Sequence, residues 1–152
     1  MRLMTRHPRF QKIIGQLGIA ALLMLPVGTL AQEPDIAGPE DWHAYSYSAE
    51  QITGNIILAP GTVEMGDAGV LTIAGVEGYT PNLFTFSGAS SLDLPEGKHF
   101  CEDGVDSGFM IIDRSQQDFL VIDVFGGDEP PVAGRSVDQQ PGFCGSFTYN
   151  KS

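Results

Sequence analysis

The sequence is poor in basic residues, and those it has are unevenly placed. Eight lysines and arginines stand against 19 aspartates and glutamates, and four of the eight lie before residue 13. Beyond residue 31 the chain has four basic and 19 acidic residues, a formal charge of −15. A surface this acidic repels the phosphates of nucleic acids and of anionic lipids. We therefore expect neither as a partner, whereas a basic protein would be attracted.

The chain also lacks helical periodicity. No stretch after residue 31 shows the i, i+3, i+4 spacing of apolar residues that marks an amphipathic helix. Short apolar runs alternate instead with turn residues from a set of 19 glycines and ten prolines. This pattern predicts an all-β fold, a single small antiparallel β-sandwich or barrel of about eight or nine short strands. Expected strands include 51–58, 91–94 and 98–101. The pattern does not decide between sandwich and barrel.

A long apolar run occurs only at the start of the sequence. Four basic residues precede a mostly apolar stretch over 13–30, and Thr29 and Ala31 place small residues where a signal peptidase acts. This predicts a secretory signal peptide over 1–31, cleaved before Gln32. An uncleaved anchor is the alternative, although glycines and a proline interrupt the run. We expect a soluble periplasmic or extracellular protein that has no membrane contact after cleavage.

The rest of the chain is long enough for one domain. The stretch 32–41 is acidic and contains two prolines, which predicts a flexible lead-in. The globular β-rich domain is then expected over 42–152. Its only cysteines are Cys101 and Cys144, and two cysteines in an exported chain favour a disulfide. Closing a loop of about 44 residues would stabilise the fold by about 4 kcal/mol.

The clearest strand pair lies over 108–125. If 114–117 forms a four-residue loop, Asp113 faces Asp118, and a salt bridge to Arg114 or splaying into solvent would relieve their repulsion. One face of this hairpin, expected to be the core, would carry Phe109, Ile111, Leu120, Ile122 and Val124. The opposite face is also apolar, with Met110, Ile112, Phe119 and Val121. It needs cover from a second sheet or a loop, or it is an exposed patch for a partner or apolar ligand, with Met110 and Phe119 as candidates.

The longest stretch without a strand pattern after residue 31 is 126–142. Loops of this length in compact domains are often functional, so we expect a recognition loop with Asp128, Glu129 and Arg135 as candidate contacts. The alternative is a plain crossover between two sheets. The final strand, Phe143–Asn150, alternates cleanly, and its aromatic face with Phe143, Phe147 and Tyr149 should be buried.

No catalytic or cofactor signature is apparent. The histidines after residue 31, His43 and His99, have no metal-ligand spacing, and no G-x-S-x-G nucleophile elbow occurs. Carboxylates near Asp103 and Asp106 suggest a weak calcium site but depart from the EF-hand pattern. We therefore expect no cofactor, metal or catalytic residue.

These features together indicate an exported, acidic, non-catalytic binding module. It would be inhibitor-like or an accessory protein of an envelope complex, and the expected partner is a basic envelope protein. A small carboxylate-dependent hydrolase and a carrier of an apolar ligand are the alternatives.

Overall fold

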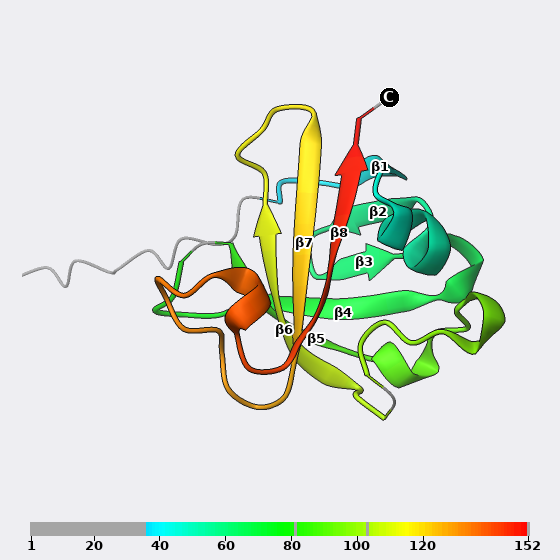
Figure 1. Ribbon diagram of the computed structural model, residues 1–152. Coiled ribbons are helices and arrows are strands. Elements are labelled where there is room, and N and C mark those ends of the chain that lie inside the picture. Colours follow the sequence, from blue (N-terminus) through cyan, green and yellow to red (C-terminus); the bar gives the residue numbers. More distant parts are fainter. Residues whose placement is uncertain (1–35, 81, 103, 152) are drawn as a thin grey trace, which may run out of the picture. The chain divides into compact units, whose positions relative to one another are not determined.

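The protein forms a closed barrel of eight antiparallel strands. The computed structural model describes residues 36–80, 82–102 and 104–151, and the predicted signal peptide, 1–31, lies outside them. Each strand pairs with its neighbour in sequence, and β8 pairs with β1 to close the barrel (Figure 1). The strands are β1 (Glu40–Ala44), β2 (Ile56–Ala59), β3 (Thr62–Glu64), β4 (Val70–Gly75), β5 (Leu83–Ser87), β6 (Ser107–Asp113), β7 (Phe119–Gly126) and β8 (Phe143–Asn150). The all-β prediction is confirmed, and the structure decides for the barrel.

Side chains fill the barrel interior. Alternate residues of each strand point inward, and eight-stranded barrels leave room for little more than these side chains. Phe147 and Tyr149 of β8 are both buried, as the sequence predicts, whereas Phe143 is only partly buried and packs against Phe125. Phe147 stacks on Phe100 with ring centroids 5.4 Å apart. The Tyr149 hydroxyl is hydrogen-bonded to that of Thr53, 2.8 Å away, and burial raises the pKa of Tyr149.

The two ends of the barrel are built differently. The 59–62, 75–83 and 113–119 connections, which join β2 to β3, β4 to β5 and β6 to β7, lie at the end where β1 begins. The 64–70 connection and the longer 44–56, 87–107 and 126–143 connections lie at the opposite end. None of the helical turns among the described residues has the length and apolar character needed to cross a membrane.

Three predicted strands are wrong in whole or in part. The first half of 51–58 belongs to the helical turn η1 (Ala49–Thr53), which ends at Gly54 with φ 63°. Neither 91–94 nor 98–101 forms a strand. Phe100 is nevertheless buried, because it packs against Phe147 and Phe86 without any backbone pairing. The segment 98–101 thus contributes a residue to the core without forming a strand.

The register of the β6–β7 hairpin differs from the predicted one. Asp113 pairs with Val121, Ile112 with Ile122 and Met110 with Val124, because β7 extends beyond β6 and its first residues pair with β8. The shift of three residues reverses the predicted faces of β6. Met110 and Ile112 therefore point into the barrel, and the prediction that Phe109 and Ile111 line the core is wrong.

A glycine explains why β6 takes this orientation. A Cβ on Gly108 would lie 2.1 Å from the carbonyl oxygen of Phe125 and 3.0 Å from the Phe86 ring. Gly108 shares the inward face with Met110 and Ile112, so the residue without a side chain sits where the strands approach most closely.

The outer face of the hairpin is partly covered by the protein itself. Leu83 and Phe125 are buried although neither belongs to the interior cluster. Phe125 contacts Phe143 at the end of the 126–142 loop, with ring centroids 5.7 Å apart, and Tyr45 packs edge-on against Phe119 at 5.2 Å. A loop and a neighbouring aromatic ring, without a second sheet, thus provide the cover.

The predicted disulfide is present. Cys101 and Cys144 are bonded, and their Cα atoms are 4.9 Å apart. The described part of the predicted lead-in, 36–41, belongs to the barrel, since Ile36 is only 8% exposed and β1 begins at Glu40.

Candidate functional site

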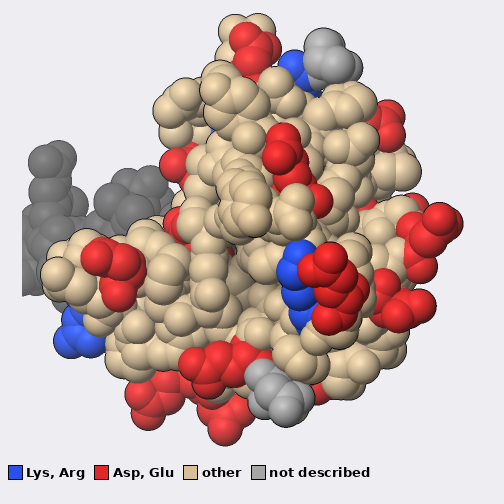
Figure 2. Space-filling model, turned by 45° about the vertical axis from the view of Figure 1, so that its right-hand side comes forward, with Lys and Arg blue, Asp and Glu red and all other residues tan. Residues whose placement is uncertain are grey.

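Negative charge dominates the described surface. Among the residues that the structure describes, sixteen are acidic and four basic, and acidic groups far outnumber basic ones on the face seen in Figure 2. Three of the four cations are paired within the protein: Lys98 with Glu96, and both Arg114 and Lys151 with Glu40. The field around the described barrel is therefore strongly negative.

The loop that follows β7 is exposed but firmly anchored. Its anchor is Gln140, a buried side chain. The Gln140 amide oxygen accepts from the Val132 N–H at 2.9 Å, and its nitrogen donates to the Val132 and Arg135 carbonyls at 2.8 and 3.1 Å. These bonds replace the strand pairing that the loop backbone lacks.

The base of the same loop is closed by three further contacts. The Gly126 N–H donates to the Gly142 carbonyl at 2.7 Å, Phe125 packs against Phe143, and the disulfide holds Cys144. A Cβ at Gly142 would lie 2.1 Å from the Gly126 carbonyl oxygen, so this closure requires glycine.

The structure separates the sequence-predicted site residues into two groups. Asp128, Glu129 and Arg135 are exposed on the anchored loop. Met110 has no exposed surface, so no partner on the outside of the barrel can reach it. Phe119 is half-buried beneath Tyr45, at the opposite end of β7 from the loop. The predicted candidates therefore do not form one continuous surface.

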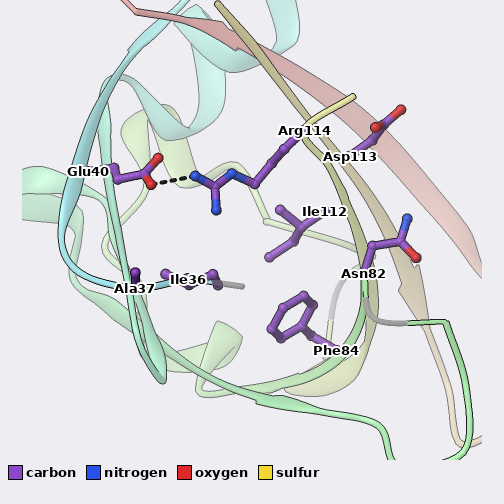
Figure 3. Close-up of a pocket in the computed structure, with 8 residues that line it drawn as sticks. All are labelled: Ile36, Ala37, Glu40, Asn82, Phe84, Ile112, Asp113 and Arg114. Carbon is purple, nitrogen blue, oxygen red and sulfur yellow. Dashed lines mark hydrogen bonds and ion pairs between the residues drawn. The ribbon is translucent and has the colours of Figure 1, made fainter. Parts of the chain in front are cut away.

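A second candidate site lies at the short-turn end of the barrel. A cavity of about 500 Å³ opens there, between the segment before β1, the start of β5 and the end of β6. Its lining residues are Ile36, Ala37, Glu40, Asn82, Phe84, Ile112, Asp113 and Arg114 (Figure 3). Three of them, Ile36, Phe84 and Ile112, are buried apolar side chains and form an apolar floor.

An ion-pair network spans the cavity mouth. Arg114 reaches across from the β6–β7 turn and donates from Nη2 to Glu40 Oε1 (Figure 3). Lys151 Nζ lies 3.7 Å from the other carboxylate oxygen, Oε2, and 4.8 Å from the centre of the Trp42 ring. Asp113 accepts a 2.8 Å hydrogen bond from the Ser115 N–H. Arg114 and Lys151 are thus both engaged with Glu40, whereas Glu40 Oε2 is buried without a hydrogen-bond partner among the described residues.

Sequence reasoning missed this cavity. Glu40 falls in the predicted lead-in, and a salt bridge from Arg114 is only one of the two ways expected to relieve the repulsion between Asp113 and Asp118. Glu40 and Arg114 are 74 positions apart. Glu40 lies on β1 and Arg114 in the turn after β6, and because β1 and β6 are not neighbours in the sheet, only barrel closure brings the two residues together. The one signal in the sequence was that Arg114, one of only four basic residues after residue 31, lies in the expected 114–117 turn.

The remaining carboxylates give no metal site. No group of three or more His, Cys, Asp or Glu residues in the described ranges is arranged to hold a metal ion. Of the calcium candidates, Asp103 lies outside the described residues, and Asp106 accepts hydrogen bonds from the Ser90 hydroxyl and amide. These bonds lower the pKa of Asp106.

Asp123 is the described aspartate with a raised pKa. It projects outward from β7 and is half-buried. Burial raises the pKa of Asp123 and the charge of Asp113 adds to the rise, whereas a hydrogen bond with Ser146 opposes it.

Comparison with known proteins gives no family model, no curated protein and no solved structure that matches this chain.

Proposed function

We propose that this protein is an exported, acidic, non-catalytic binding module, inhibitor-like or accessory to an envelope complex, whose partner is a basic protein. The observation that carries this proposal is the anchored loop 127–139. It is almost wholly exposed, yet Gln140, the closed base and the disulfide hold it in one conformation.

A loop of this kind is suited to recognition. Binding by a flexible loop costs about 0.5–1.5 kcal/mol for each side chain that becomes ordered, and prior anchoring reduces that cost. The loop presents three exposed carboxylates, Asp128, Glu129 and Asp138, together with Val132, which is 54% exposed. An exposed apolar side chain in a loop that also carries exposed carboxylates is complementary to a basic protein surface that has an apolar depression.

The charge of the whole molecule supports the same kind of partner. The negative field would steer a basic protein toward the barrel and raise its association rate. Because exposed charges are screened over about 8 Å at physiological ionic strength, the complex should weaken as salt is raised. Export, which the N-terminal sequence predicts, would bring the protein to an envelope partner.

The test is affinity capture with residues 32–152 immobilised. An envelope extract of the native host is applied at low salt and eluted in rising salt, and each retained species is identified by mass. The loop variant Asp128→Asn/Glu129→Gln/Asp138→Asn is run in parallel. A control, Glu64→Gln/Asp67→Asn/Glu77→Gln, removes the same charge from exposed positions elsewhere.

The proposal predicts one stoichiometric basic protein that the wild type and the control retain and the loop variant releases. Equal retention by the loop variant and the control would show a general charge effect without a recognition loop. No partner at low salt would refute the proposal altogether.

A further inference from the structure

The short-turn end of the barrel has the features of a small-molecule site. Small-molecule sites are concave and mostly apolar, with volumes of about 300–1,000 Å³, and the mouths of β-barrels are a frequent location. The cavity here measures about 500 Å³. Its floor of Ile36, Phe84 and Ile112 lies beneath the Arg114–Glu40 pair (Figure 3).

The filled interior fixes how far a ligand can enter. Met110 and Leu120 in the middle of the barrel have no exposed surface, so the space ends at the floor of the mouth. A bound molecule would lie between that floor and the ion pair above it. Compact molecules therefore fit this site better than long chains.

The charges at the mouth indicate what kind of molecule fits. Glu40 contacts two cations, Arg114 and Lys151, and Asp113 accepts the Ser115 N–H. Both cations near the mouth are therefore committed to Glu40. An anionic ligand would lose its hydration on entry without gaining an uncommitted cation, whereas an uncharged apolar molecule would lose little and cover the apolar floor.

We propose that this cavity binds a compact, uncharged, apolar molecule. The cavity is lined from the ends of the strands where β1 begins, whereas loop 127–139 follows the other end of β7, and the site does not depend on the protein partner proposed above. Either proposal can fail without the other.

Two dyes with one ring skeleton test the proposed ligand class. N-phenyl-1-naphthylamine is uncharged at neutral pH, and 1-anilinonaphthalene-8-sulfonate adds one sulfonate to the same skeleton. Both increase their fluorescence in apolar sites, so each can be titrated into residues 32–152. The expected result is one site for the uncharged dye and at least about tenfold weaker binding of the sulfonate, because its charge has no uncommitted partner.

Two variants test the location of the site, each by a substitution in a different part of the cavity lining. Ala37→Trp and Asn82→Trp place a large ring at the mouth from the segment before β1 and from the start of β5. Ala133→Trp adds the same ring to the exposed far loop as a control. Thermal melts confirm that each variant folds. Both mouth variants should weaken binding of the uncharged dye about tenfold or more, and the control should leave it unchanged.

Three outcomes would overturn the proposal. The first is no saturable binding of the uncharged dye by the folded wild type. The second is equal affinity in the control and both mouth variants, which would place the dye elsewhere. The third is equal or tighter binding of the sulfonate, which would show that the guanidinium of Arg114 recruits an anion and that the ligand is an apolar acid.

Discussion

Replacing Gln140 by alanine should release loop 127–139 while the barrel stays folded. The substitution removes three hydrogen bonds to the loop backbone, at 2.8, 2.9 and 3.1 Å. Each contributes about 1 kcal/mol net, so the free energy of opening the loop should fall by about 3 kcal/mol. That corresponds to a rise of roughly a hundredfold in the open population.

Trypsin provides the assay, because Arg135 is the only basic residue in the loop. When opening and closing are fast, the cleavage rate follows the open population. Cleavage after Arg135 leaves the fragments joined through Cys101–Cys144, so electrophoresis after reduction reveals the released 136–152 peptide. The rate should rise roughly a hundredfold in Gln140→Ala, in line with the same 3 kcal/mol.

The neighbouring residue provides a matched control. Gln139 is exposed, and Gln139→Ala should be cut at the wild-type rate. If Gln140→Ala were also cut at that rate while its melting temperature stayed unchanged, the loop would not depend on this anchor. The argument that the loop is preorganised for binding would then fail.

Three further predictions concern the barrel. Cys101→Ser/Cys144→Ser should lower the free energy of unfolding in urea by about 4 kcal/mol, and a loss below about 1 kcal/mol would show that the bond constrains the unfolded chain little. Gly108→Ala should cost about 3 kcal/mol or more, because its Cβ would meet a backbone carbonyl at 2.1 Å; Gly38→Ala, with open space around it, should melt like the wild type. Because burial raises the pKa of Asp123, the folded state holds its proton to higher pH than the unfolded state, and stability falls as pH rises from about 4 through the raised value. Asp123→Asn should therefore raise the melting temperature at pH 7 but not at pH 3, and equal effects at both would contradict the assigned cause.

Local patterns in the sequence were sufficient for several features. Turn residues between short apolar runs predicted an all-β fold, and strict alternation predicted which face of β8 is buried. The final strand, Phe143–Asn150, has the predicted bounds. The cysteine pair was predictable because two cysteines allow only one intramolecular pairing. These inferences depend either on residues that are close in sequence or, for the two cysteines, on there being only one possible pairing.

The register of β6 and β7 was not predictable in this way. Both strands are apolar on both faces, so alternation cannot say which face is inside. The decision came from a close backbone approach at Gly108 and from the pairing of Phe119 with β8. As a result, Met110, which was predicted as a candidate for an exposed patch, lies in the barrel interior.

Composition and local pattern were enough to predict the β class, the disulfide and an acidic chain with one long loop. They could not predict that the sheet closes into a barrel, since closure depends on the pairing of β1 with β8, which lie at opposite ends of the described chain. That closure also brings Glu40 to Arg114 and creates the mouth cavity. Contacts across such separations depend on the joint packing of all eight strands, and no local pattern records that packing.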